Sequence, residues 1–228
     1  MRALMILLLA AALIPATAGA ASLRPWVEAT GSWATYSMGD VNKYVGNINA
    51  DIAPLSMDKI HNGLGFGGRI GLDLPKTLGF GVGYERLGAS TDVSDAGATL
   101  TLAHPANAFS AFFEYRLPEQ GRFGMLLGVS GGMVSESGKL EMEGPTRSET
   151  ITLSGSGPLF QLYFGSTLWA MPQFGIGAAA GYRYARIGQV TAKEEGVSVV
   201  MRNADNSDMT TDYSGAFVRL GLKFVFGK

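Results

Sequence analysis

The chain has 228 residues, of which 46% are hydrophobic and 32 are glycine, and its formal net charge is −1. These values are compatible with a single all-β domain of roughly 200 residues, and the near-neutral charge leaves no basic surplus for binding nucleic acid. The chain contains no cysteine, which excludes disulfides, thiolate catalysis, cysteine-based metal sites and a lipid-anchored cysteine.

Residues 1–20, MRALMILLLAAALIPATAGA, have the pattern of a cleaved export signal. Arg2 precedes an apolar run, and Pro15 ends that run well short of the roughly 20 apolar residues that a membrane-spanning helix needs. Small residues follow, so we expect cleavage after about Ala20 and one domain over residues 21–228. Export of a chain without disulfides favours the envelope of a bacterium.

After the signal, apolar residues alternate with small or charged ones in eight segments. Residues 64–74 are a clear example, because one parity is mostly leucine, phenylalanine and isoleucine while the other is glycine, arginine and aspartate. Alternation with a period of two predicts β-strands. The predicted strands are, in chain order, residues 24–38, 64–74, 78–85, 109–117, 123–130, 159–165, 174–184 and 212–226. An even number of strands lets the last pair with the first.

The connections between these strands alternate in length. Short turns are predicted near Pro75, Glu119 and Pro172. The other connections are longer and polar and cover residues 39–62, 88–100, 136–150 and 188–211. Short periplasmic turns on one side and long extracellular loops on the other are typical of transmembrane barrels.

The first long loop contains a predicted helix. Asp40 is expected to cap it, and apolar residues follow at helical spacing as far as Ile52. We expect a short amphipathic helix that lies on the membrane surface or over the barrel mouth.

The alternation has the opposite sense to that of a soluble barrel. Large apolar residues share their parity with the aromatics, whereas the other parity collects glycine and charge, and lipid requires this arrangement outside a spanning barrel. The fold class is therefore predicted as an all-β, eight-stranded, antiparallel, transmembrane up-and-down β-barrel. The predicted lining charges are Glu28, Arg69, Asp73, Glu85, Glu114, Arg116, Arg183, Arg219 and Lys223. Four acids and five bases are expected to pair and to fill an interior only wide enough for side chains.

Aromatic residues are predicted to form two belts at the membrane interfaces. Those expected toward the loop end are Trp33, Tyr84, Tyr182 and Tyr184, and those toward the turn end are Tyr115, Phe123, Trp169, Phe174, Phe224 and Phe226.

The C-terminal residues match a polar–x–Gly–x–x–apolar–x–aromatic signal at Arg219, Gly221, Phe224 and Phe226. With the strand pattern, this signal resembles the family of small outer-membrane β-barrels that includes the OmpA membrane domain and OmpX. The resemblance implies insertion by the barrel-assembly machinery, a bacterial outer-membrane location, contact with lipid and lipopolysaccharide, and a monomer. Members usually stop at the aromatic residue, whereas this chain continues with Gly227 and Lys228.

The sequence gives little support for catalysis, and no catalytic residue, cofactor or metal site is predicted. His61 and His104 are expected to be solvated loop or strand-end residues, and Ala106 stands where lipid A deacylases carry the serine of a His-x-Ser pair. A G-x-G-x-x-G match over residues 63–68 continues as a strand rather than the helix of a nucleotide site. Acidic residues in the long loops are either solvated or bridged to lipopolysaccharide by divalent cations; they are Asp92, Asp95, Glu141, Glu143, Glu194, Glu195, Asp205 and Asp208.

Three functions remain open on this basis. The leading prediction is a non-enzymatic envelope protein with a charge-filled interior and a structural or surface-interaction role for its loops. A narrow conduit for small hydrophobic solutes, as in OmpW-like barrels, is suggested by three apolar residues in the predicted lining, Phe112, Leu126 and Phe217. A lipid A-modifying enzyme is the third.

Overall fold

The computed structural model describes residues 23–75, 77–95, 98–118, 120–144, 148–194 and 196–227. The predicted signal over residues 1–20, with its cleavage after Ala20, lies outside these residues, as do Glu119, Glu195 and Lys228.

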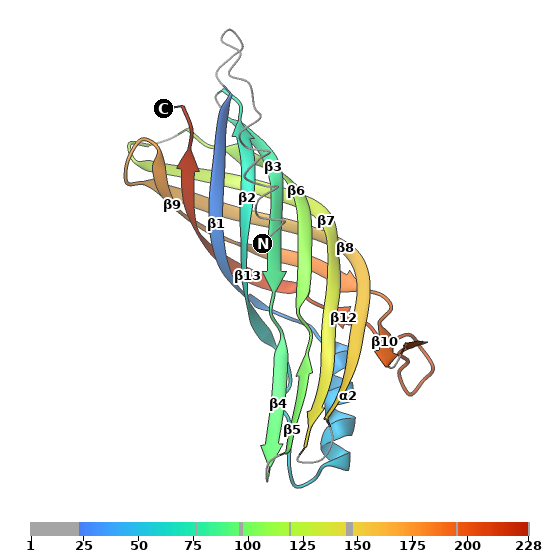
Figure 1. Ribbon diagram of the computed structural model, residues 1–228. Helices are drawn as coiled ribbons and strands as arrows, with labels where there is room; N and C mark the ends of the chain where they lie inside the picture. Colours follow the sequence, from blue (N-terminus) through green and yellow to red (C-terminus); the bar gives the residue numbers. More distant parts are fainter. Residues whose placement is uncertain are drawn as a thin grey trace.

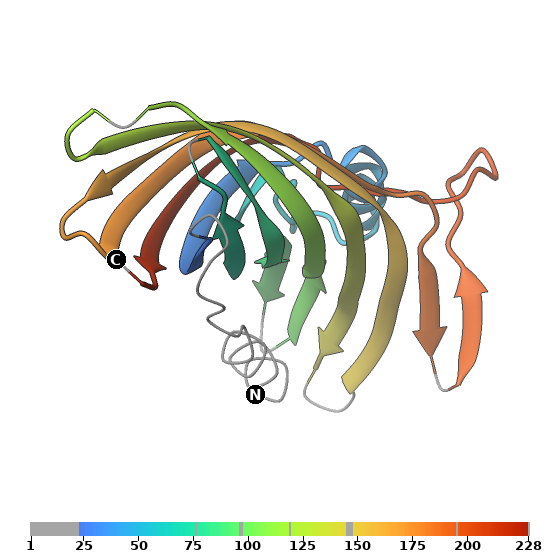
Figure 2. The same ribbon diagram turned by 90° about the horizontal axis from the view of Figure 1, so that it is seen from above.

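Eight antiparallel strands pair in a closed ring, seen from the side in Figure 1 and from above in Figure 2. Around the ring they are β1 (Arg24–Thr35), β2 (Asn62–Asp73), β3 (Leu78–Leu87), β6 (Ala106–Arg116), β7 (Phe123–Glu143), β8 (Ser148–Trp169), β9 (Phe174–Ile187) and β13 (Gly215–Val225). The last strand closes on the first, with Glu28 opposite Lys223. The predicted eight-stranded antiparallel barrel is therefore confirmed. Among the described residues, no helix has the length and apolarity needed to cross a membrane.

Inward-facing glycines make room for large lining side chains. A Cβ atom on Gly128 would lie 2.3 Å from the ring of Tyr163, and one on Gly71 would lie 2.4 Å from the ring of Trp26. Both distances are shorter than van der Waals contact, so any other residue would displace these rings. The run of glycines at residues 63–68 lies within β2 and forms no nucleotide-binding turn.

The long connections contain more strand than predicted. Residues 136–150 were expected to be a polar loop, but β7 and β8 extend to Glu143 and from Ser148 and pair across this region. Further strands are β4 (Ser90–Asp95), β5 (Ala98–Ala103), β10 (Thr191–Glu194), β11 (Val197–Val200) and β12 (Thr211–Asp212). In Figure 2 the orange β10–β11 hairpin stands to one side of the ring. The wall therefore continues beyond the ring as a six-stranded sheet in the order β11–β10–β8–β7–β5–β4.

Helix α2 (Gly39–Asp51) lies beside this extension, at the lower end of Figure 1 and opposite the C-terminus. Its Val41 and Val45 are fully buried in the same apolar cluster as Leu140 and Leu153 of the extended wall. The helix therefore covers the mouth of the barrel, which is one of the two expected positions.

Asp40 does not cap helix α2, contrary to the prediction. The helix starts one residue before it, and Met38 occupies the cap position without a side-chain hydrogen bond. The Asp40 carboxylate instead accepts hydrogen bonds from the backbone N–H of Thr210, at 3.1 Å, and from its hydroxyl, at 2.8 Å. These bonds tie the helix to the segment before β12. Although partial burial acts in the opposite direction, they lower the pKa of Asp40.

The two faces of the wall exchange character at one level along β7. Val129 and Met133 point outward and are 48% and 60% exposed, as expected for a surface that contacts lipid. Beyond them the outward positions become Ser135 and Ser137, while the inward face changes to buried apolar residues such as Val134. The chain thus combines a lipid-compatible half with a half that is built like a water-soluble protein.

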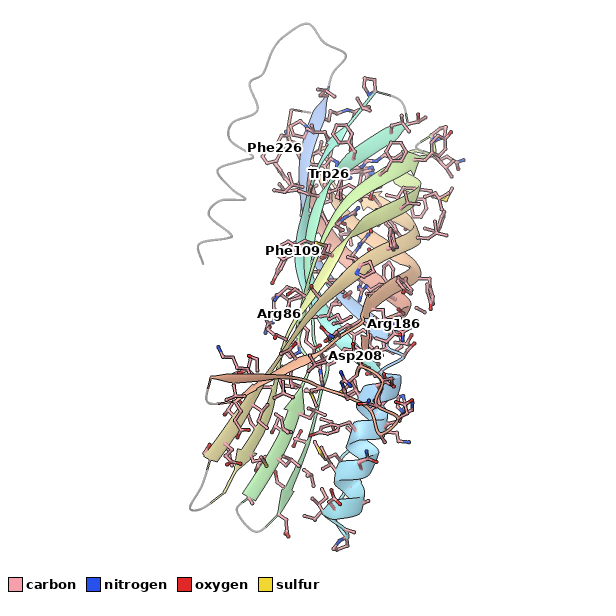
Figure 3. The ribbon with its side chains drawn as sticks, turned by 90° about the vertical axis from the view of Figure 1, so that its right-hand side faces the viewer. Trp26, Arg86, Phe109, Arg186, Asp208 and Phe226 are labelled. Atoms are coloured by element: carbon pink, nitrogen blue, oxygen red, sulfur yellow. The ribbon has the colours of Figure 1, made fainter. Side chains whose placement is uncertain are left out.

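Basic residues lie close to the border between the two halves, which on β7 falls between Met133 and Ser135. In Figure 3, Arg86 and Arg186 lie at similar heights, between Phe109 of the apolar belt and the part of the chain that holds α2. Phe226 and Trp26 lie near the other end, with the short turns. The apolar belt is therefore bounded on both sides.

Candidate functional site

The centre of the lumen is filled by an ion cluster around Arg69. Its guanidinium donates to Glu114 at 2.5 Å, to the hydroxyl of Tyr163 at 2.7 Å and to Glu28 at 3.1 Å. It also lies 3.9 Å from the ring centroid of Phe112. Both terminal nitrogens of this guanidinium therefore meet acceptors, and strands β1, β2, β6 and β8 are joined through the lumen.

A second cluster occupies the turn end. Arg116 pairs with Asp73 and donates to Glu114 at 3.1 Å, which connects this cluster to the central one. Trp26 donates its indole N–H to Asp73 at 2.5 Å. The ammonium of Lys223 lies 3.8 Å from the ring centroid of Trp26, in a cation–π contact.

The loop end of the lumen holds a third cluster. Arg183 donates to Glu85 at 2.8 Å, and Ser32 also donates to Glu85. Arg219 lies 4.9 Å from the ring centroid of Tyr163, which links this level to the central cluster.

All nine predicted lining charges thus point into the lumen, and within the described residues seven of them form ion pairs. Three cavities along the lumen measure about 20 Å³ each, enough for about one water molecule. The arrangement can hold strands together, and each of these three cavities between described residues is too small for a solute larger than water.

Trp26 was not expected in the lumen, and Tyr163 was predicted to point inward by the alternation along residues 159–165 but was not expected as a partner of the lining charges. Trp26 shares the parity of Glu28 on β1, which was the available signal, but an aromatic residue there was not expected inside a lumen of charges. A cation–π contact explains its presence, because the ring covers the ammonium of Lys223, for which no ion pair is found among the described residues.

Three residues of the predicted assembly signal lie in β13, and the fourth, Phe226, directly follows it. Arg219 points inward, and Gly221 leaves space for Glu28, since a Cβ atom would lie 2.4 Å from its carboxylate. Phe224 and Phe226 are outward, with ring centroids 5.1 Å apart in an edge-to-face contact. Gly221 therefore has a packing role that is separate from any role in assembly.

The prediction for His104 is wrong. This side chain is fully buried, and its Nδ1 contacts the carboxylate of Glu136 on β7, which is also fully buried. Tyr213 donates to the backbone carbonyl of His104 at 2.7 Å. Because a lipid substrate cannot reach a residue with 0% exposure, the pair is a structural part of the buried core. His61 is exposed, as expected.

The acidic residues of the long connections do not gather into a metal site. Among the described residues, no group of three or more histidine, aspartate or glutamate side chains has the geometry to hold a metal ion. Some pair locally, as Glu141 does with Lys139 at 3.3 Å. Asp95 and Glu143 instead line an open pocket near the end of helix α2.

No family model matches the chain, and no curated protein matches it. Solved structures with a similar course include Neisserial surface protein A, with 14% identity over 89% of this chain and 96% of that one, and a TM-score of 0.44. The outer membrane protein OprG from Pseudomonas aeruginosa has 11% identity over 90% and 95%, with a TM-score of 0.43. The outer membrane protease OmpT from Escherichia coli has 10% identity over 90% and 96%, with a TM-score of 0.37. At identities this low, the function of this chain has to come from its own residues.

Proposed function

We propose that the chain is a non-enzymatic protein of the bacterial outer membrane, with a sealed lumen and a folded extracellular half that serves a structural or surface-interaction role. The observation that carries this proposal is the exchange of faces along β7. Below the border, apolar Val129 and Met133 are outside, and above it Ser135 and Ser137 are outside. One wall that fits lipid over part of its length and water over the rest belongs to a protein displayed at a membrane surface.

The filled lumen supports the same role. A wall joined through its interior by Arg69 and Arg116 is rigid, and it presents the sheet beyond the membrane as a fixed surface. We expect lipopolysaccharide to contact outward-facing basic side chains near the border, such as Arg86 and Arg186 (Figure 3). Insertion by the barrel-assembly machinery, a monomeric state and kinship with OmpA- and OmpX-like barrels belong to this proposal.

Cysteine labelling of intact cells tests the proposed display, because the natural chain has no cysteine. Ser137→Cys, above the border, should react with a membrane-impermeant maleimide. Val129→Cys, in the apolar belt, should not react, and Met171→Cys, at the short-turn end, should react only after the outer membrane is permeabilised. Labelling of Met171→Cys but not of Ser137→Cys in intact cells would reverse the proposed orientation.

The conduit is the second candidate. Phe112 and Phe217, two of its predicted apolar lining residues, pack on different aromatic rings, Trp26 and Tyr163. Guanidinium groups lie over both of them. Uptake of small apolar solutes into liposomes should therefore be unchanged by the protein, and faster uptake would favour the conduit.

Lipid A modification is the third candidate, and the burial of His104 opposes it. The mass spectrum of lipid A should be the same with the wild-type chain and with His61→Ala. A mass change that depends on His61 would revive the enzymatic reading.

A further inference from the structure

An open pocket of about 440 Å³ lies where helix α2 ends against the extended wall. Ile52 and Leu55 form its helix side. Val93, Leu100 and Met142 form its wall side and are neighbours in register across β4, β5 and β7. Closer to the barrel, helix α2 packs against the inward apolar side chains of the extended wall, such as Leu140 and Leu153, and these are buried. At the pocket the helix has ended, so the row formed by Val93, Leu100 and Met142 is only partly covered.

The size and lining of this pocket suit a small organic molecule. Its volume falls within the range of about 300–1,000 Å³ that is typical of ligand sites, and such sites combine an apolar lining with a few polar groups. The lumen cavities, at about 20 Å³ each, are large enough only for about one water molecule. Met142 remains 36% exposed, and a ligand that covered it would remove apolar surface from water.

The charges around the pocket favour one sign of ligand. Asp95 and Glu143 are acidic residues of its lining, and no lysine, arginine or histidine is found among its described lining residues. An anionic amphiphile would be repelled, whereas a cationic group at the mouth would be attracted by the negative charges of Asp95 and Glu143. Among molecules with the same apolar body, the lining therefore favours those with a positively charged group over those with a negatively charged one.

We propose that this pocket binds small amphipathic organic cations, with the alkyl or aryl body against Leu100 and Met142 and the ammonium group among the carboxylates. The proposal goes beyond the structural role of the chain and does not depend on whether the lumen conducts. Each methylene added to a bound chain should tighten binding by roughly threefold to fourfold until the pocket is full.

Isothermal titration of the folded barrel in lipid nanodiscs tests the proposal, with empty nanodiscs as the reference for partition into lipid. The probes are butyl-, hexyl- and octyltrimethylammonium, with hexyl sulfate and hexanol as anionic and neutral analogues. The expected result is saturable binding that strengthens with chain length, and a preference of at least about tenfold for the hexyl cation over hexyl sulfate. Equal affinity for the two hexyl ions, or no heat beyond that of empty nanodiscs, would overturn it.

Matched variants place the binding in the pocket. Leu100→Arg brings a cation to the wall side and should abolish binding of the cations, whereas Thr101→Arg, on the other face of the same strand, should leave it unchanged. Asp95→Asn with Glu143→Gln should remove most of the preference for cations and keep the dependence on chain length. Binding that is the same in both this double variant and the wild type would refute the assignment, even if Leu100→Arg failed to fold.

Discussion

Replacing Glu114 by glutamine probes the central ion cluster. The carboxylate is fully buried and accepts from Arg69 at 2.5 Å, from Arg116 at 3.1 Å and from the Tyr163 hydroxyl at 3.1 Å. Glutamine keeps the size but removes the charge and directs an N–H₂ group toward donors. Removing one partner of a buried ion pair costs about 3–5 kcal/mol. In the variant Arg69 still has its ion pair with Glu28, at 3.1 Å, so we expect the lower end of this range, a loss of about 3 kcal/mol in the free energy of unfolding.

Urea unfolding in lipid vesicles at neutral pH, followed by tryptophan fluorescence, measures this loss. Glu141→Gln is the matched control, since it makes the same change in the ion pair with Lys139. In that pair the Glu141 side chain is 37% exposed and the Lys139 side chain is 55% exposed. An exposed pair contributes below about 1 kcal/mol. If Glu114→Gln were no more destabilising than Glu141→Gln, the lumen cluster would not be what stabilises the barrel.

Three further predictions concern packing, the cap and assembly. Gly128→Val should destabilise the barrel by about 1–3 kcal/mol by displacing Tyr163, whereas Gly131→Val, where a Cβ atom meets nothing closer than 3.6 Å, should be nearly neutral in the same unfolding assay. The pKa of Asp40 is lowered in the folded chain. The hydrogen bonds by which Asp40 anchors α2 should therefore be fully present at a pH above the ordinary pKa of an aspartate, and they should be lost as the pH falls through the lowered pKa. Amide chemical shifts of α2 followed from pH 6 to pH 2.5 should show this step, and its survival in Asp40→Asn would contradict the assignment. Phe226→Ala should slow insertion by the barrel-assembly machinery in a pulse-chase experiment, and unchanged kinetics would remove the residue from the signal.

The part of the chain inside the apolar belt was predictable because lipid imposes a strict rule. Each outward residue must be apolar, so the alternation gives the parity of Arg69 and Glu114 directly. The partners within the lumen were not predictable, since parity places a side chain on a face but does not say which opposite strand it reaches. The contact of Arg69 with Tyr163, which are 94 residues apart, is an example.

The half beyond the apolar belt was harder to predict because its outward residues are polar and its inward residues are apolar, which is the reverse of the pattern inside the belt. Beyond Met133, the outward residues are serine, threonine and charge, which in isolation indicate a loop, although β7 and β8 continue as paired strands. Burial of His104 had no local signal, because it depends on Glu136 of β7 and on Tyr213, which are both distant in the sequence. Tertiary contacts, rather than local composition, decide such positions.

Planar-bilayer recording of the purified barrel tests the sealed lumen most directly, with a general porin in the same bilayers to show that insertion is detected. Paired charges that span the lumen, with cavities of about 20 Å³ between them, predict no stable single-channel steps. Large, stable, single-channel conductance from the inserted wild-type barrel would contradict the account.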